Sequence, residues 1–127
     1  MLETSLVARL APIITNLYPL VAPKKTPENA ATWMPAVLYN RSDTVPVDDL
    51  SVGITANAKL WLQVDCYDYT YLAAKTLAET IRENLEVWVD DEVQSVSWTG
   101  EHDTIDNTTE STLYRTMLNF EIYVNLD

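Results

Sequence analysis

Cys66 and the two aspartates beside it are the residues whose types and spacing could do chemistry. They lie in LQVDCYDYTYLAAKTLAETI, residues 62–81. A catalytic cysteine needs a base or a positive neighbour that lowers its pKa. Asp65 and Asp68 would raise that pKa instead, and the single histidine, His102, lies far along the chain. The pattern therefore favours a buried structural cysteine over a nucleophile.

Two further groups of acidic residues could in principle form a reaction centre or hold a metal ion. A paired-carboxylate hydrolase needs two carboxylates that converge in a cleft, whereas Asp65 is expected on the polar face of a strand and Asp68 near a helix N-terminus. The segment GEHDTID, residues 100–106, lacks the pattern of an EF-hand loop and has too few His or Cys residues for zinc. We expect a solvated acidic loop over residues 100–112, with a weak cation site as the alternative. No catalytic residue, metal or cofactor is predicted.

Composition limits the classes of function. The 127 residues suggest one domain, residues 1–127. The formal net charge is −11, and the eight basic residues are scattered, which argues against direct binding of nucleic acid. Two glycines cannot build a phosphate-binding loop. The chain has no apolar run long enough for a membrane span, and its first residues, which carry Glu3 and no basic region, are not expected to be a signal peptide.

The first half of the chain predicts a helix and one or more strands. Apolar residues recur at helical spacing over residues 2–17, and Pro12 should bend or end that helix near Ala11. A proline-rich connecting loop is expected over 18–32 and a short strand over 33–41. Residues 42–58 lack a clean period and suggest a long excursion or a hairpin, with Gly53 suited to a turn.

The second half carries the clearest patterns. Residues 59–67 alternate, with Leu60, Leu62, Val64 and Cys66 on one face. A helix should follow, with Thr70 as its N-cap or Asp68 as the rival, and should end near Leu85. Strands are predicted over 93–99 and 113–124. The element order indicates an α+β fold, a mostly antiparallel sheet of four to five strands with two helices packed on one face.

The sheet face opposite the helices is expected to carry large side chains. Those side chains are Trp61, Tyr67, Met117 and Tyr123. Aromatic residues and methionine on a second sheet face suggest burial against another subunit. The alternative is an ordinary amphipathic surface.

Three segments resemble a known family. They are LQVDCYDYTYLAAKTLAETIRENL, then ESTLYRTMLNFEIYV near the end, and LVARLAPIITNLYPLVAP followed by MPAVLYNR near the start. In this order and spacing they resemble the tail completion proteins of tailed bacteriophages, also called tail terminator or tail-to-head joining proteins. The resemblance covers most of the chain.

That resemblance implies a structural, non-enzymatic phage protein. It implies a ring, expected to be hexameric, at the head-proximal end of the tail in the virion, formed after synthesis in the host cytoplasm. The ring would end polymerisation of the tail tube and join the tail to the head connector. Its partners would be copies of itself, the tail tube protein and a head completion or connector protein, with no membrane involved. From the net charge of −11 we expect an acidic lumen, through which DNA passes without specific binding.

Nine residues are candidates for contacts between subunits or along the tail axis. The candidates are Trp61, Tyr67, Met117, Tyr123, Arg41, Asp48, Asp49, Glu101 and Asp103. The strongly negative net charge also permits an alternative hypothesis. In that case the chain is an acidic DNA-mimic or inhibitor-type interaction module, with carboxylates spaced like phosphates.

Overall fold

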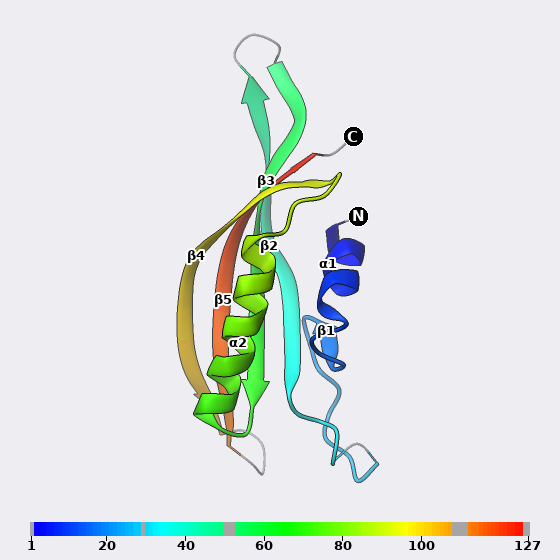
Figure 1. Cartoon of the computed structure of the whole chain (residues 1–127), viewed down its shortest axis with the longest axis vertical. Coiled ribbons are helices and arrows are strands. Elements are labelled where there is room, and N and C mark those ends of the chain that lie inside the picture. The colour runs from blue at the N-terminus through cyan, green and yellow to red at the C-terminus, as the bar shows by residue number, and fades with distance from the viewer. Residues whose placement is uncertain (1, 29, 50–52, 108–111, 126–127) are drawn as a thin grey trace.

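Two helices cover one face of a five-stranded sheet in the computed structural model (Figure 1). The structure describes residues 2–28, 30–49, 53–107 and 112–125, without the side chains of 46–56. The elements in chain order are α1 (Leu2–Leu10), β1 (Leu17–Pro19), β2 (Ala36–Asp49), β3 (Gly53–Asp68), α2 (Tyr71–Glu86), β4 (Val93–Asp106) and β5 (Leu113–Asn125). The predicted α+β class is confirmed.

The strands lie in the order β1-β2-β3-β5-β4. The short β1 runs parallel to β2, and the other neighbouring pairs are antiparallel. The sheet is therefore mixed but mostly antiparallel, as predicted. β1 itself was missed, because it falls where the predicted helix and the proline-rich loop meet and is only three residues long.

The core lies between the helices and the sheet face that they cover, here called the helix face. The alternation predicted for β3 is confirmed, since Leu60, Leu62, Val64 and Cys66 are all buried there. β5 supplies a matching row, and the helices close the layer. The members from these elements are Leu118, Phe120, Ile122 and Val124 of β5, Leu2, Leu6 and Leu10 of α1, and Ala78, Ile81 and Leu85 of α2.

α1 ends at Leu10, so of the outcomes expected at Pro12 the helix ends rather than bends, and the rest of the apolar pattern to residue 17 is not helical. Pro12 has no backbone N–H and its ring crowds the preceding turn, so the helix stops just before it. Ile14 remains buried although it is no longer helical. The guanidinium of Arg9 donates two hydrogen bonds to the carbonyl oxygen of Asn84, at 3.3 and 3.0 Å, and so ties α1 to α2.

α2 begins where the sequence predicted. The Thr70 hydroxyl accepts a hydrogen bond from the Ala73 N–H at 3.1 Å, so Thr70 is the N-cap and Asp68 is not. The helix ends at Glu86 and leads into a segment that we call the 87–92 turn. Asp90 orders this turn, because its carboxylate accepts hydrogen bonds from the N–H groups of Glu92 and Val93 and from the indole of Trp88.

Three strands are longer than predicted. β4 runs on to Asp106, so the expected acidic loop over 100–112 is wrong for residues 100–106. Hydrogen bonding to β5 holds this acidic stretch, with Glu101 opposite Leu118 and Asp106 opposite Leu113. β2 and β3 extend through 42–58 as a hairpin, one of the two interpretations of that segment, and Gly53 is the first residue of β3.

The β2–β3 hairpin extends beyond the rest of the sheet. β5 pairs with β3 as far as Asn57, whereas β2 and β3 stay paired up to Asp49 and Gly53 (Figure 1). A two-stranded ribbon without further packing is marginally stable in water. The projecting end of the hairpin is therefore suited to contact with another molecule.

Truncation of Leu6 should show how much the packing of α1 on the sheet contributes to the free energy of unfolding. Leu6→Ala removes a fully buried side chain and leaves a cavity between α1 and the sheet. We expect the free energy of unfolding to fall by about 2–5 kcal/mol. Val7→Ala, at the 37% exposed neighbour on the same helix, is the control and should cost less than about 1 kcal/mol. Urea unfolding followed by circular dichroism measures both; equal losses would contradict the assignment of Leu6 to the core.

Candidate functional site

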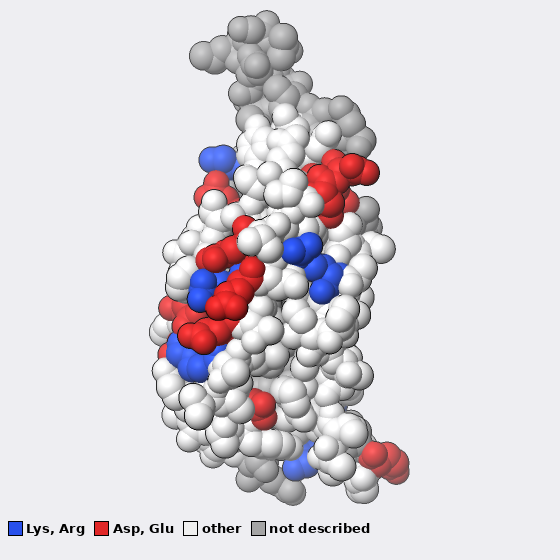
Figure 2. Space-filling model, in the orientation of Figure 1, with Lys and Arg blue, Asp and Glu red and all other residues white. Residues whose placement is uncertain are grey.

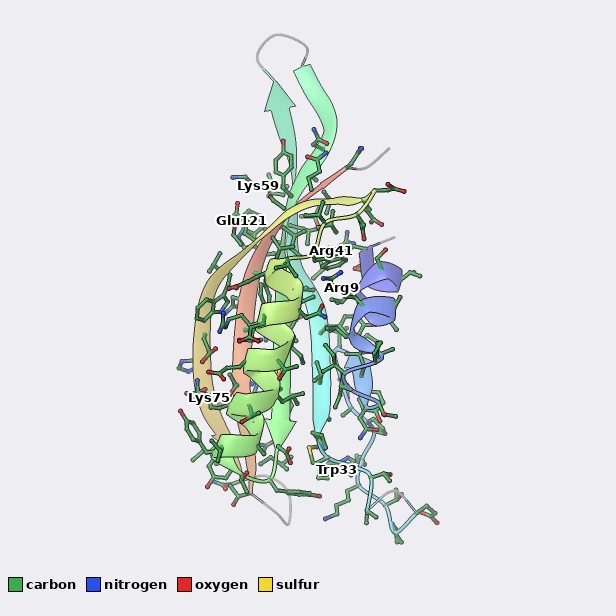
Figure 3. The ribbon with its side chains drawn as sticks, viewed as in Figure 1. Arg9, Trp33, Arg41, Lys59, Lys75 and Glu121 are labelled. Atoms are coloured by element: carbon green, nitrogen blue, oxygen red, sulfur yellow. The ribbon has the colours of Figure 1, made fainter. Side chains whose placement is uncertain are left out.

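The sheet surface opposite the helices, here called the far face, carries the predicted large side chains. Trp61, Tyr67, Met117 and Tyr123 all lie at far-face positions in the register of β3 and β5, and all four are half-buried. Beside them Lys59 and Glu121 form an ion pair at 3.3 Å (Figure 3). The far face thus carries aromatic rings and a thioether, which are enriched at subunit interfaces, together with a Lys–Glu ion pair.

One carboxylate on this face is buried and paired. Asp65 is 7% exposed, and its Oδ2 lies 2.9 Å from Nη2 of Arg115. The Gln63 amide also donates to Asp65, at 3.1 Å. The guanidinium of Arg115 lies 5.7 Å from the centre of the Tyr67 ring. Burial raises the pKa of Tyr67, with Asp65 adding to the rise and Arg115 opposing it. Asp65 is therefore fixed by its neighbours and does not converge with Asp68 on a cleft.

Cys66 has the surroundings of a structural residue. Its side chain is fully buried on the helix face. Burial raises the pKa of the thiol far above its ordinary value, and the charges of Asp65 and Glu101 raise it further. His102 lies opposite Met117, on the far face, so the sheet separates it from the thiol. This environment suppresses the thiolate that nucleophilic chemistry requires.

Glu101 and Asp103 belong to a cluster between α2 and β4. The Lys75 ammonium contacts the carboxylate of Glu101 and lies 3.0 Å from Asp103 (Figure 3). Asp103 also accepts hydrogen bonds from Thr116 at 3.0 Å and from Tyr71 at 3.2 Å. The bond to Glu101 raises the pKa of Lys75. Burial alone would raise the pKa of Asp103, but its bonds to Lys75 and Thr116 lower it.

This cluster does not form the alternative cation site. Glu101 and Asp103 stand opposite Leu118 and Thr116 and face the helices, whereas His102 lies on the far face. Among the residues that the structure describes, no three His, Cys, Asp or Glu side chains are grouped to hold a metal ion. Lysine instead supplies the positive charge that the two carboxylates require.

The remaining candidates lie on β2. Arg41 forms an ion pair with Glu3 at 2.7 Å and so ties β2 to α1 (Figure 3). Asp48 and Asp49 belong to the projecting part of the β2–β3 hairpin, and their side chains lie outside the part of the chain that the structure describes. Whether any of the nine candidates contacts another subunit stays a prediction.

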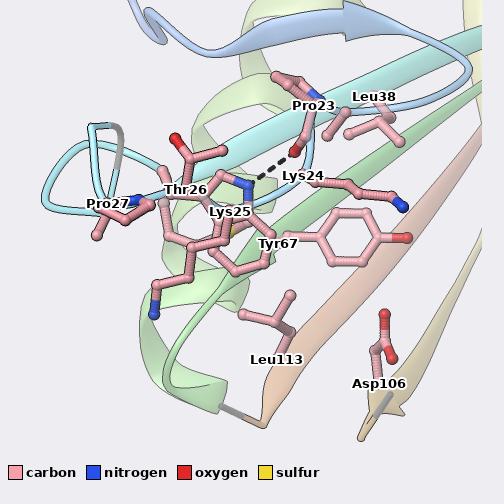
Figure 4. Close-up of a pocket in the computed structure, with 13 residues that line it drawn as sticks. Pro23, Lys24, Lys25, Thr26, Pro27, Leu38, Tyr67, Asp106 and Leu113 are labelled. Carbon is pink, nitrogen blue, oxygen red and sulfur yellow. Dashed lines mark hydrogen bonds between the residues drawn. The ribbon is translucent and has the colours of Figure 1, made fainter. Parts of the chain in front are cut away.

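A pocket of about 730 Å³ was not foreseen from the sequence (Figure 4). It forms where residues 22–27 and 30–34, around the end of the proline-rich loop, meet the far face, and we call it the loop pocket. Trp33 is 8% exposed, and its indole donates to the carbonyl oxygen of Pro23 at 2.9 Å. The far face contributes Leu38, Tyr67 and Leu113. Trp33 was assigned to the predicted strand 33–41, but β2 begins only at Ala36, and a tryptophan directly after the proline-rich stretch was the signal that this segment packs on the domain.

Charge is unevenly distributed around these surfaces. Acidic and basic side chains are interleaved over α2, while acidic side chains gather where the 87–92 turn lies (Figure 2). At the loop pocket Lys25 lies 5.7 Å from the ring centres of both Trp33 and Tyr69. Lys24 and Asp106 also line the pocket, so two lysines and one carboxylate lie there although the chain as a whole is strongly acidic.

Comparison with known proteins gives a structural likeness but no family. No protein-family model matches the chain, and a search of curated proteins found no match. Among solved structures, the chain is similar to a chain of the virion of native gene transfer agent (GTA) particle. The TM-score is 0.60 at 15% sequence identity, over 94% of this chain and 84% of that chain. This likeness shows a shared fold.

In the described part of the chain, neither helix has the length and apolar character of a membrane span.

The α2–β4 cluster predicts a pH dependence. Because the pKa of Asp103 is lowered on folding, its contribution to stability is present above the pKa of the unfolded state and is lost as the pH falls through the folded value. Asp103→Asn should therefore lower the free energy of unfolding at pH 7 and weaken its decline below about pH 4. The loss should stay under about 1 kcal/mol, because the side chain is 36% exposed.

Urea unfolding at a series of pH values from neutral to acidic measures this effect. Asp91→Asn, at an exposed carboxylate on the 87–92 turn, is the matched control. If the two variants lost the same stability with the same pH profile, the cluster around Lys75 would have no specific role.

Proposed function

We propose that the chain is a structural component of a phage-like virion. In this proposal it forms a six-membered ring at the head-proximal end of the tail, ends polymerisation of the tail tube and joins the tail to the head connector. The supporting observation is the likeness to a chain of the gene transfer agent virion, which extends over 94% of this chain. The family resemblance of the segments 62–85 and 110–124 is independent of that likeness and points the same way.

The surfaces of the molecule suit this role. A closed ring uses heterologous contacts, so each subunit needs two different contact surfaces plus upper and lower faces for other partners. The far face offers half-buried aromatic side chains for contacts within the ring. The projecting β2–β3 hairpin extends along the long axis of the molecule and is suited to axial contacts with the tail tube or the connector (Figure 1).

Charge supports passage of DNA without adhesion. The net charge of −11 would repel the phosphate backbone from a lumen lined by this chain. The alternative role as a DNA mimic receives less support from the structure. Glu101 and Asp103 share one lysine and sit between α2 and β4, which is unlike a row of free, phosphate-spaced carboxylates.

The native mass in solution tests the proposed ring. Light scattering on a size-exclusion column, across a range of protein concentrations, should give a species of about six subunits. Should the protein be a monomer at every concentration, a preformed ring is excluded. Binding to purified tail tubes would then decide the proposal, and failure to cap their ends would overturn it.

The far face should be required for the assembly. Trp61→Lys places a charge among half-buried aromatic side chains, and we expect subunit association to weaken about tenfold or more. Leu72→Lys is the control, because Leu72 is 74% exposed on α2, on the other side of the sheet. Circular dichroism checks that both variants fold. Equal assembly by both variants would remove the far face from the interface.

A further inference from the structure

The loop pocket and the 87–92 turn have complementary properties. The pocket is concave and mainly apolar, with Trp33 on its wall. Its charged lining residues are Lys24, Lys25 and Asp106, which together carry a net positive charge. The turn carries Val87 and Val89, which are 71% and 68% exposed, followed by the exposed carboxylate of Asp91. The pocket offers a site for apolar side chains beside a positive charge. The turn offers exposed valines beside a negative charge.

The two surfaces cannot meet within one molecule. Tyr69, whose ring lies under Lys25, stands two residues before the start of α2, whereas the 87–92 turn directly follows its end. The 16 residues of α2 span about 24 Å at the α-helical rise. The turn follows the upper end of α2 in the ribbon, whereas Trp33 lies beyond its lower end (Figures 1 and 3). Contact between the two surfaces therefore requires a second copy.

The turn is held in the shape that exposes its valines. Trp88 is buried between them, and its indole donates to Asp90 at 2.8 Å. Asp90 also accepts from the N–H groups of Glu92 and Val93, at 2.8 and 2.7 Å. A segment fixed in this way loses little conformational entropy when it binds.

The pocket is similarly prepared. The hydrogen bond from Trp33 to Pro23 fixes the ring against the loop, and Pro23 and Pro27 restrict the loop backbone. Lys25 lies over the faces of two aromatic rings, an arrangement that positions its ammonium without neutralising the charge. A carboxylate that approaches the rim would meet this fixed positive charge.

We infer that the 87–92 turn of one copy docks into the loop pocket of the next copy. Val89 would lie against Trp33, and Asp91 would face Lys25. The inference rests on the proposed ring and names one of its contacts. Because the two surfaces differ, the contact is heterologous and repeats head to tail, so that it closes into a ring where the rotation between copies permits.

Disulfide cross-linking between singly substituted chains tests the contact. Lys25→Cys and Asp91→Cys are prepared separately, mixed and oxidised with copper phenanthroline. A mixed dimer should form at least about tenfold faster than when Lys25→Cys is mixed with Glu79→Cys, an exposed site along α2. Cys66 stays in place because its thiol is buried, and oxidation of the unsubstituted chain reports the background. If the mixed dimer forms no faster than in the Glu79→Cys control, the docking contact is overturned.

A chain with both substitutions separates this inference from the ring. Lys25→Cys with Asp91→Cys should give a ladder of cross-linked species that ends at one closed oligomer. A ladder that continues without closure would support the contact and overturn the ring. A ring seen by light scattering in the unsubstituted chain, without cross-linking above the control, would keep the ring and overturn the docking of the turn.

Discussion

Burial of one sheet face under two helices is the interaction on which the rest of the structure depends. β3 and β5 present continuous apolar rows to that layer, and α1 and α2 fill the space above them. Because each strand places alternate residues on opposite faces, the same register that buries Leu62 and Phe120 sends Trp61 and Glu121 to the far face. The core and the candidate interaction surface are thus two consequences of a single alignment, and a shift of one residue would exchange them.

Charged side chains then fix the periphery. Lys75 gathers two carboxylates of β4 under α2, Arg41 ties β2 to α1, and Arg115 holds Asp65 on the far face. These pairs join elements that are distant in the sequence. They also neutralise part of the acidic surface locally, so that the remaining negative charge is concentrated at places such as the 87–92 turn (Figure 2).

The proposed assembly role follows from surfaces and needs no catalytic centre. The groups that chemistry would use are each held in structural positions: Cys66 is buried, Asp65 is paired and Asp103 is bonded to Lys75. What the molecule offers to other molecules is a half-buried aromatic face, a projecting hairpin, a mainly apolar pocket lined by two lysines and one aspartate, and an acidic turn. Contact surfaces of several kinds on a small domain are what a subunit in a virion requires.

The sequence by itself determined those features that depend on local periodicity and on single-residue chemistry. Alternation in 59–67 and 113–124, the Thr70 cap, the end of the first helix before Pro12 and the burial of Cys66 needed no knowledge of distant contacts. Only the tertiary structure decided whether polar segments form strands or loops. Residues 100–106 read as a loop because they are acidic, yet pairing with β5 and the charge of Lys75 make them a strand. The loop pocket likewise arises only where residues 22–34 reach the far face, because a pocket is formed by segments that meet in space.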